Sequence, residues 1–189
     1  MSRKYALCLP LLTAVMLLAG CARTELSRNP SDLSGAEQAS GEEAQPLSFE
    51  AQDMEGNTVS ADIFSEAELT MVNVWATYCN PCLREMPGLG ELAGEYESGE
   101  FQILGIISDV PEGTEQKTLD LVAELIDKTG ADYPHLLLNK SLYDALLTDV
   151  TAVPTTFFID QDGTILEKVI GSMEKSAWEE KINALLEKE

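Results

Sequence analysis

The chain has 189 residues, of which 33 are acidic and 12 are basic, so its formal net charge at pH 7 is −21. A surface this acidic repels phosphate backbones and anionic head groups, which excludes nucleic acid as a natural partner. The acidity provides either solubility or a docking surface for a basic partner, and of these two interpretations we favour solubility.

The N-terminal segment resembles a secretory signal peptide. Arg3 and Lys4 precede an apolar run over residues 5–18 that is too short for a comfortable membrane span. The run LAGC follows at residues 18–21 and resembles the lipobox of bacterial lipoproteins, which implies lipidation at Cys21 and a location on the extracytoplasmic side of a bacterial envelope. The alternatives are an ordinary cleaved signal and an uncleaved anchor. Permanent tethering would need two or more acyl chains.

The segment that follows Cys21 is predicted to be a tether for a globular domain. Residues 22–46 are rich in Ser, Glu, Ala, Gly and Gln and contain only two large apolar side chains, Leu26 and Leu33, so disorder is expected. We therefore divide the chain into a signal peptide at 1–20, a lipidated cysteine and tether at 21–46, and one domain at 47–189.

The domain alternates strand-like and helix-like patterns. A β-hairpin is predicted at residues 47–51 and 58–60, a buried strand at 70–76, and a helix from 80 or 81 to about 96, loosened near Gly88 and Gly90. The later elements are a strand at 101–107, a helix at 115–128, a strand at 136–138, a helix at 141–147, a hairpin of 155–159 with 165–170, and a helix at 174–188. This order indicates an α/β fold with a central mixed β-sheet flanked by helices and with parallel early crossovers.

Two cysteines three positions apart, Cys79 and Cys82, are the most informative pair. Cys8 leaves with the signal and Cys21 would carry the lipid, so these two remain as thiols. A bridge between them closes too short a loop to stabilise a fold, which favours a reactive role. A helix N-terminus stabilises a thiolate at Cys79, which would attack a substrate disulfide before Cys82 resolves the mixed disulfide.

A zinc site is the main alternative use of paired cysteines. Structural zinc takes four Cys or His ligands, whereas this region offers one cysteine pair and the single histidine, His135. We therefore expect neither a metal nor another cofactor. His135 is expected at a strand edge or in a loop, without an acid or base beside it in sequence.

Two motifs carry a family resemblance. The run WATYCNPC at 75–82 resembles the active-site run of the thioredoxin superfamily, and LREMP at 83–87 narrows this to the ResA/TlpA-like thiol-disulfide oxidoreductases. The run VPTTFFID at 153–160 matches the same family's second signature. The resemblance covers about residues 47–189 and implies a thioredoxin fold with an N-terminal β-hairpin and a strand-helix insertion near residues 101–130.

The resemblance also implies roles around the cysteine pair. Pro154 is expected to be cis, so that the backbone before it, at Val153, can pair with an extended substrate; the residues alone favour a trans proline before an edge strand. Trp75 and Tyr78 are expected to shape the substrate pocket, and Pro81 stiffens the loop between the two cysteines.

One departure from thioredoxin concerns proton transfer. Thioredoxin has a buried aspartate six residues before the nucleophile, and this chain has Asn73 there, whose amide cannot transfer a proton. Glu85 is the candidate replacement, because it lies three residues after Cys82 on the same helix and matches the glutamate to which acid-base behaviour is attributed in ResA-like proteins. The alternative is a solvated acid in the first helical turns.

The resemblance implies a reductase that takes electrons from a membrane thiol donor and passes them to disulfides of exported proteins, with apocytochrome c or oxidised surface proteins as typical targets. We expect the protein to be a monomer. A dithiol oxidant would use the same two cysteines. A redox-inactive or copper-handling binding lipoprotein is the alternative from another class. The pocket motif of the peroxide-reducing relatives is not recognisable.

Overall fold

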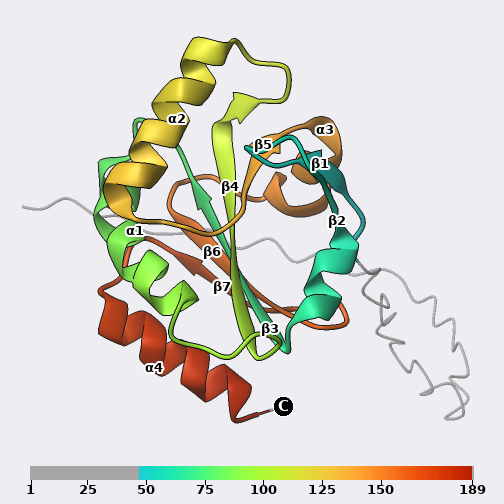
Figure 1. Ribbon diagram of the computed structural model, residues 1–189. Helices are drawn as coiled ribbons and strands as arrows, with labels where there is room; N and C mark the ends of the chain where they lie inside the picture. The colour runs from blue at the N-terminus through green and yellow to red at the C-terminus, as the bar shows by residue number, and fades with distance from the viewer. Residues whose placement is uncertain (1–46, 189) are drawn as a thin grey trace, which may run out of the picture. The chain divides into compact units, whose positions relative to one another are not determined.

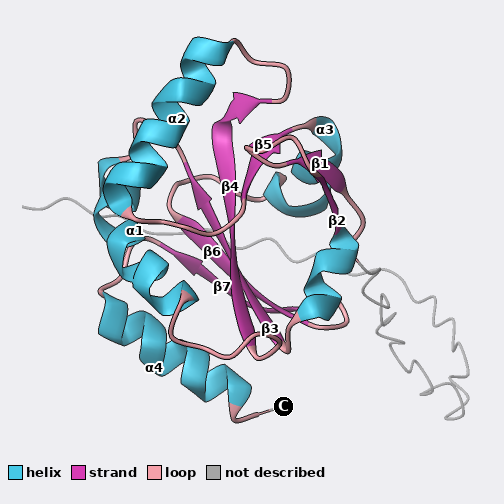
Figure 2. Ribbon diagram, viewed as in Figure 1, coloured by secondary structure: helices cyan, strands magenta, loops and turns pink. Residues whose placement is uncertain are grey.

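The structure is a computed structural model that describes residues 47–188. The predicted signal peptide, the lipidation of Cys21 and the tether lie outside the described residues. Within residues 47–188, a five-stranded sheet has the order β5-β4-β3-β6-β7 and a separate two-stranded sheet pairs β1 with β2 (Figures 1 and 2). No helix in that range is long and apolar enough to cross a membrane.

The parallel half of the sheet contains the most apolar runs. Strands β3 (Leu69–Trp75), β4 (Phe101–Pro111) and β5 (His135–Leu138) pair in parallel, and the helices α1 (Asn80–Ala93) and α2 (Gln116–Thr129) form the crossovers. All seven residues of β3 are buried, as expected for a strand covered on both faces. The predicted parallel crossovers are confirmed.

The antiparallel half follows later in the chain. Strand β6 (Thr155–Asp160) pairs with β3 on one side and with β7 (Ile165–Ile170) on the other, both antiparallel. The turn between β6 and β7 places Gly163 at φ +81°, where a side chain would be strained. Before β6, the short helix α3 (Lys140–Leu142) continues into a π-helical turn, η2 (Tyr143–Leu147).

The N-terminal hairpin is also confirmed. It consists of β1 (Glu50–Gln52) and β2 (Thr58–Ser60), followed by the 3-10 helix η1 (Ala61–Glu66). The Asp53 carboxylate holds the turn by accepting hydrogen bonds from the backbone N–H groups of Glu55 and Asn57, at 3.0 and 2.7 Å.

The helices divide between the two faces of the sheet. Helices α1, α2 and α4 (Lys175–Leu186) cover one face, and the hairpin, η1 and α3 cover the other (Figure 1). On the helix-covered face, Met71 of β3 packs with Trp178 of α4, and Trp75 packs with Met86 of α1. On the opposite face, Val72 and Val74 pack with Phe49, Phe64 and Leu142. Asn73 is two residues from both Met71 and Trp75, so it lies on the same face of β3 as they do and points toward α1.

Helix α1 differs from its prediction in two ways. It ends at Ala93, three residues before the predicted end, and it continues unbroken through Gly88 and Gly90. Gly90 is required by packing, because a Cβ atom there would lie 2.0 Å from the backbone oxygen of Gly130, at the end of α2. The glycine therefore allows α1 and α2 to approach closely instead of loosening the helix.

Candidate active site

The cysteine pair lies where β3 ends and α1 begins. Cys79 is the N-cap residue of α1, and its Sγ accepts a hydrogen bond from the backbone N–H of Cys82 at 3.2 Å. The two residues form a disulfide with their Cα atoms 5.3 Å apart. Cys79 is 5% exposed and Cys82 is fully buried, so a partner can approach the site only at Cys79.

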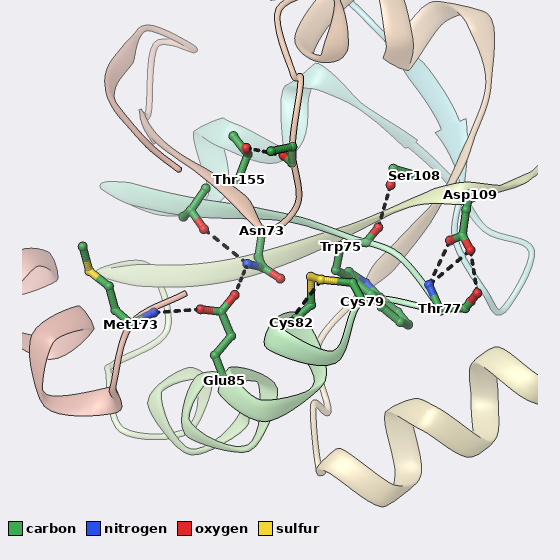
Figure 3. The surroundings of a disulfide bond; sticks show 12 residues. Asn73, Trp75, Thr77, Cys79, Cys82, Glu85, Ser108, Asp109, Thr155 and Met173 are labelled. Carbon is green, nitrogen blue, oxygen red and sulfur yellow. Dashed lines mark hydrogen bonds between the residues drawn. A yellow bond between two sulfur atoms is a disulfide. The ribbon is translucent and has the colours of Figure 1, made fainter. Parts of the chain in front are cut away.

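The loop before Cys79 is fixed by β4. Asp109 accepts hydrogen bonds from the backbone N–H of Thr77, at 3.0 and 3.2 Å, and from its hydroxyl, at 2.5 Å. The Ser108 hydroxyl donates to the backbone oxygen of Trp75 at 2.9 Å (Figure 3). Sequence reasoning missed Asp109, although it follows the predicted strand at the sheet edge where parallel strands end together.

Glu85 lies in the interior beneath the cysteine pair. Its side chain is in α1 and is only 6% exposed. It accepts hydrogen bonds from the backbone N–H of Met173 at 3.1 Å, the amide of Asn73 at 3.2 Å and the indole of Trp178 at 3.4 Å. Burial raises the Glu85 pKa to about 7 in spite of these three donors. Glu85 is therefore a buried carboxyl that titrates near neutrality, and the solvated-acid alternative is wrong.

A cavity gives Glu85 a route to solvent. It has a volume of about 430 Å³ and lies between the first turns of α1 and the segment before α4. Its lining includes Glu85, Pro81, Arg84 and Lys175. A proton can therefore exchange between the Glu85 carboxyl and water without passing through the disulfide.

His135 is more closely tied to the site than its sequence position indicated. It is the first residue of the edge strand β5, as expected, but it is 1% exposed and hydrogen-bonded to an active-site residue. Its Nδ1 accepts from the indole N–H of Trp75 at 3.1 Å, and its Nε2 lies 3.0 Å from the backbone oxygen of Ala131. Burial lowers the His135 pKa to about 4, so the ring is neutral with its proton on Nε2.

Gly105 makes the His135 position possible. It lies between Asn73 and His135 in the register of the three parallel strands, and a Cβ atom there would lie 2.1 Å from His135 Nδ1. A glycine inside an apolar strand was the available signal for this close approach.

Trp75 is fully buried, so it supports the cysteine loop from below and presents no surface to a partner.

The outward-facing residues lie on the other side of Cys79. Tyr78 is 73% exposed, and the Val153–Pro154 peptide bond is cis, as the family resemblance implied. Val153 packs against the cluster that contains both cysteines. Tyr78 and Val153 also line a groove of about 250 Å³ with Tyr143 and Val150.

Comparison with known proteins identifies the family. Residues 41–168 match the AhpC/TSA family. The thiol-disulfide oxidoreductase ResA of Halalkalibacterium halodurans is 30% identical over 136 residues, which cover 72% of this chain and 72% of the relative. This chain belongs to the AhpC/TSA family. Together with its disulfide and its thioredoxin fold, this makes it a thioredoxin-like thiol-disulfide oxidoreductase.

Two further relatives agree with this family membership. The thiol:disulfide interchange protein DsbE of Escherichia coli K12 is 29% identical over 175 residues, covering 93% of this chain and 88% of the relative. A solved structure of a thioredoxin-family thiol:disulfide interchange protein from Chlorobium tepidum superposes with a TM-score of 0.63 and 25% identity, covering 76% of this chain and 98% of the other.

The described part of the chain contains no group of side chains suited to hold a metal ion. Within residues 47–188, no three His, Cys, Asp or Glu side chains gather as metal ligands. The two cysteines and Glu85 are buried and lie together at the cap or in the first turns of α1.

Proposed function

We propose that this oxidoreductase reduces disulfide bonds of exported proteins outside the cytoplasm, with Cys79 as the attacking thiolate, Cys82 as the resolving thiol and Glu85 as the acid-base group. The observation that carries this proposal is the burial of Glu85, with a pKa of about 7, on the same helix as the buried Cys82. A buried thiol needs a base to become a nucleophile, and a base is most effective when its pKa lies near the working pH.

The proposed reaction has two exchange steps. The Cys79 thiolate attacks one sulfur of the substrate disulfide, forms a mixed disulfide and releases the other substrate sulfur as a thiolate. Cys82 then loses its proton to Glu85 and attacks the sulfur of Cys79, which forms the Cys79–Cys82 disulfide and releases the second substrate thiolate. The proton leaves Glu85 through the cavity beside it. A dithiol donor reduces the enzyme again and supplies two electrons and two protons.

The direction of electron flow is inferred from the charges near Cys79. Residues 80–83 of the first turn of α1 carry no charged side chain, and the Asp109 carboxylate is bonded to Thr77, two residues before Cys79. Negative charge near a thiolate disfavours it, whereas strong dithiol oxidants depend on a stabilised reduced form. The Asp109 carboxylate therefore offsets part of the stabilisation that the N-terminus of α1 gives the Cys79 thiolate, which supports the reductant direction that the family resemblance implies.

The rest of the proposal concerns location and partners. A lipid on Cys21 and a tether of residues 22–46 would hold a monomeric domain on the outer side of the membrane, with an r.m.s. reach of roughly 25–30 Å. At that distance the domain could meet both a membrane thiol donor and exported substrates. Apocytochrome c and oxidised surface proteins are the substrates that we propose to test first.

The experiment that tests the roles of the cysteines is trapping in the envelope. In the full chain, Cys82→Ser is expected to accumulate mixed disulfides through Cys79, because the resolving thiol is missing. Cys79→Ser is the matched control and is expected to trap none. Equal trapping by both variants would contradict the assigned order of attack. A fully functional Cys79→Ser protein would instead favour a redox-inactive or copper-handling binding lipoprotein.

A second measurement tests the direction. The reduction potential of the Cys79–Cys82 pair is expected to lie near thioredoxin, at about −270 mV, and far from strong oxidants such as DsbA, at about −120 mV. The potential is measured by equilibration with glutathione and with dithiothreitol. A value near the oxidant end would replace the reductase proposal with the dithiol oxidant.

A further inference from the structure

The buried amide of Asn73 is only half satisfied while the disulfide is present. Its Nδ2 donates to Glu85 Oε1 and to Thr156 Oγ1, both at 3.2 Å. Its Oδ1 is buried and has no hydrogen-bond partner among the described residues. A buried acceptor without a donor costs about 1–3 kcal/mol, so the site retains this arrangement at a cost to stability.

The free oxygen of this amide faces the disulfide. Figure 3 shows the nitrogen of Asn73 turned toward Glu85 and its oxygen turned toward the sulfur atoms at the start of α1. When Glu85 is ionised, the contact of Nδ2 with its carboxylate fixes this orientation, because the opposite orientation would place Oδ1 against the negative charge. The sulfur atoms of a disulfide carry no hydrogen, so the oxidised protein offers Asn73 no donor from this pair.

We propose that Asn73 Oδ1 is a redox-selective acceptor, which takes a hydrogen bond from the Cys82 thiol once the disulfide is reduced. Reduction adds two electrons and two protons, breaks the S–S bond and leaves Cys82 as S–H on the side of Asn73 toward which this oxygen is turned (Figure 3). Asn73 then acts as a positioning residue that stabilises the dithiol form and keeps Cys82 protonated until Glu85 takes the proton. This inference rests on the resolving role of Cys82 in the proposed function.

The same amide couples Cys82 to Glu85. An ionised Glu85 polarises the Nδ2–H bond of Asn73, and this makes Oδ1 a stronger acceptor at the other end of the amide. When Glu85 becomes protonated, this polarisation weakens and so does the acceptor strength toward Cys82. The two groups therefore sense each other's protonation through Asn73, although the amide itself transfers no proton.

Infrared spectroscopy of the Cys82 thiol tests the proposal. The sample is the reduced full chain carrying Cys79→Ser, and the Cys82 band is assigned by subtracting the spectrum of Cys79→Ser/Cys82→Ser. The S–H stretching frequency is expected below that of a free thiol in the parent. It is expected to rise in Asn73→Leu and to stay low in Asn73→Asp, which keeps an acceptor oxygen. Thr156→Val is the matched control, because it removes a partner of Nδ2 and leaves Oδ1 in place.

The redox equilibrium gives an independent measurement with both cysteines present. A thiol is a weak donor, so Asn73→Leu is expected to move the equilibrium with glutathione about two- to fivefold toward the disulfide, or about 10–20 mV. Thr156→Val should leave it within the error of the measurement. The inference would be overturned if the Cys82 thiol of the Cys79→Ser protein had the S–H frequency of a free thiol. Equal shifts of the redox equilibrium in Asn73→Leu and Thr156→Val would also overturn it.

These measurements also separate this inference from the proposed function. The infrared band reports on reduced Cys82 and requires no substrate. A failure to trap substrates with Cys82→Ser would therefore leave the band unaffected. If Asn73→Leu does not fold, which its denaturant midpoint would reveal, Asn73→Asp and the parent band still decide whether Cys82 is hydrogen-bonded.

Discussion

Glu85 and His135 are two buried titratable groups, Glu85 in helix α1 and His135 at the start of strand β5. Glu85 has a pKa raised to about 7 and borders a cavity of about 430 Å³. His135 has a pKa lowered to about 4 and is enclosed by Trp75, Tyr133 and the backbone of Ala131. Burial disfavours the charged form in both, and the two pKa values move in opposite directions because one group is an acid and the other a base.

This difference indicates that Glu85 can exchange protons during the reaction, whereas His135 only holds its neighbours in place. Both ring nitrogens of His135 have partners suited to the neutral ring, so the histidine is satisfied in one protonation state. Glu85 is hydrogen-bonded as a carboxylate but desolvated enough to hold a proton near pH 7. A group that is nearly balanced between two states can exchange protons during a reaction, whereas one that is fixed in a single state can only hold its neighbours.

Removal of the His135 ring should have the largest effect on stability. His135→Ala would leave a cavity beneath Trp75 and an unpaired indole N–H, so a loss of about 4 kcal/mol in the free energy of unfolding is expected. Denaturant unfolding of the oxidised protein measures this loss. The pH at which thiol exchange changes rate should stay near 7 in this variant. A displaced inflection would show that His135 acts on the chemistry directly.

The pH dependence of stability should reveal both groups with opposite signs. The unfolded state binds the extra proton at His135, so that contribution is full above about pH 6.5 and is lost toward pH 4, by roughly 3 kcal/mol. The folded state binds the extra proton at Glu85, so its contribution is full below about pH 4.5 and is lost as pH rises to about 7, again by roughly 3 kcal/mol.

Glu85→Gln isolates one of these two contributions. The variant should gain stability relative to the parent by roughly 3 kcal/mol as pH rises from about 4.5 to 7, because it has no carboxyl to ionise in the interior. Chemical unfolding at several pH values, with the disulfide intact in both proteins, measures the difference. A difference that stays constant with pH would mean that Glu85 titrates normally in the folded protein.

The same substitution should slow catalysis. Glu85→Gln keeps the shape of the side chain but cannot accept the Cys82 proton, so the rate of disulfide exchange at pH 7 should fall about 100-fold. The inflection near pH 7 should disappear from the rate profile. His135→Gln is the comparison at the other buried titratable group and should change the rate less than about threefold, because His135 transfers no proton in the proposed reaction. Equal losses in both variants would remove the distinction between the two groups.

The sequence predicted the parts of this site that depend on local spacing. The buried run at 70–76, the cysteine pair at a helix start and the placement of Glu85 three residues after Cys82 all follow from periodicity within one or two elements. The cis geometry at Pro154 came from the family resemblance, because the residues alone favoured trans. The helix predicted at 141–147 was found in place, but no pattern distinguishes its π-helical turn from an ordinary one.

The missed features depend on the register between strands. Asn73, Gly105 and His135 lie side by side because β3, β4 and β5 pair in parallel, and no local pattern sets that alignment. The bond from Trp75 to His135 joins residues 60 positions apart, and the clamp from Asp109 to Thr77 joins residues 32 apart. Such contacts appear only once the crossover helices have fixed the strands relative to one another.

Tyr133 lies between the two groups, and its substitution should have the smallest effect. Its ring packs on His135 with the centroids 4.5 Å apart, and its buried hydroxyl has no hydrogen-bond partner among the described residues. Burial raises the Tyr133 pKa, and the charge of Glu85 raises it further, so the hydroxyl stays neutral.

Tyr133→Phe removes an unsatisfied group and keeps the ring, so a gain of about 1 kcal/mol in the free energy of unfolding is expected, with the inflection of the exchange rate near pH 7 unchanged. Denaturant unfolding and the exchange profile measure both quantities. A loss of stability, or a shift in the pH at which the exchange rate changes, would show that the Tyr133 hydroxyl interacts with Glu85. Tyr133 would then take part, with Glu85, in the proton chemistry of the site.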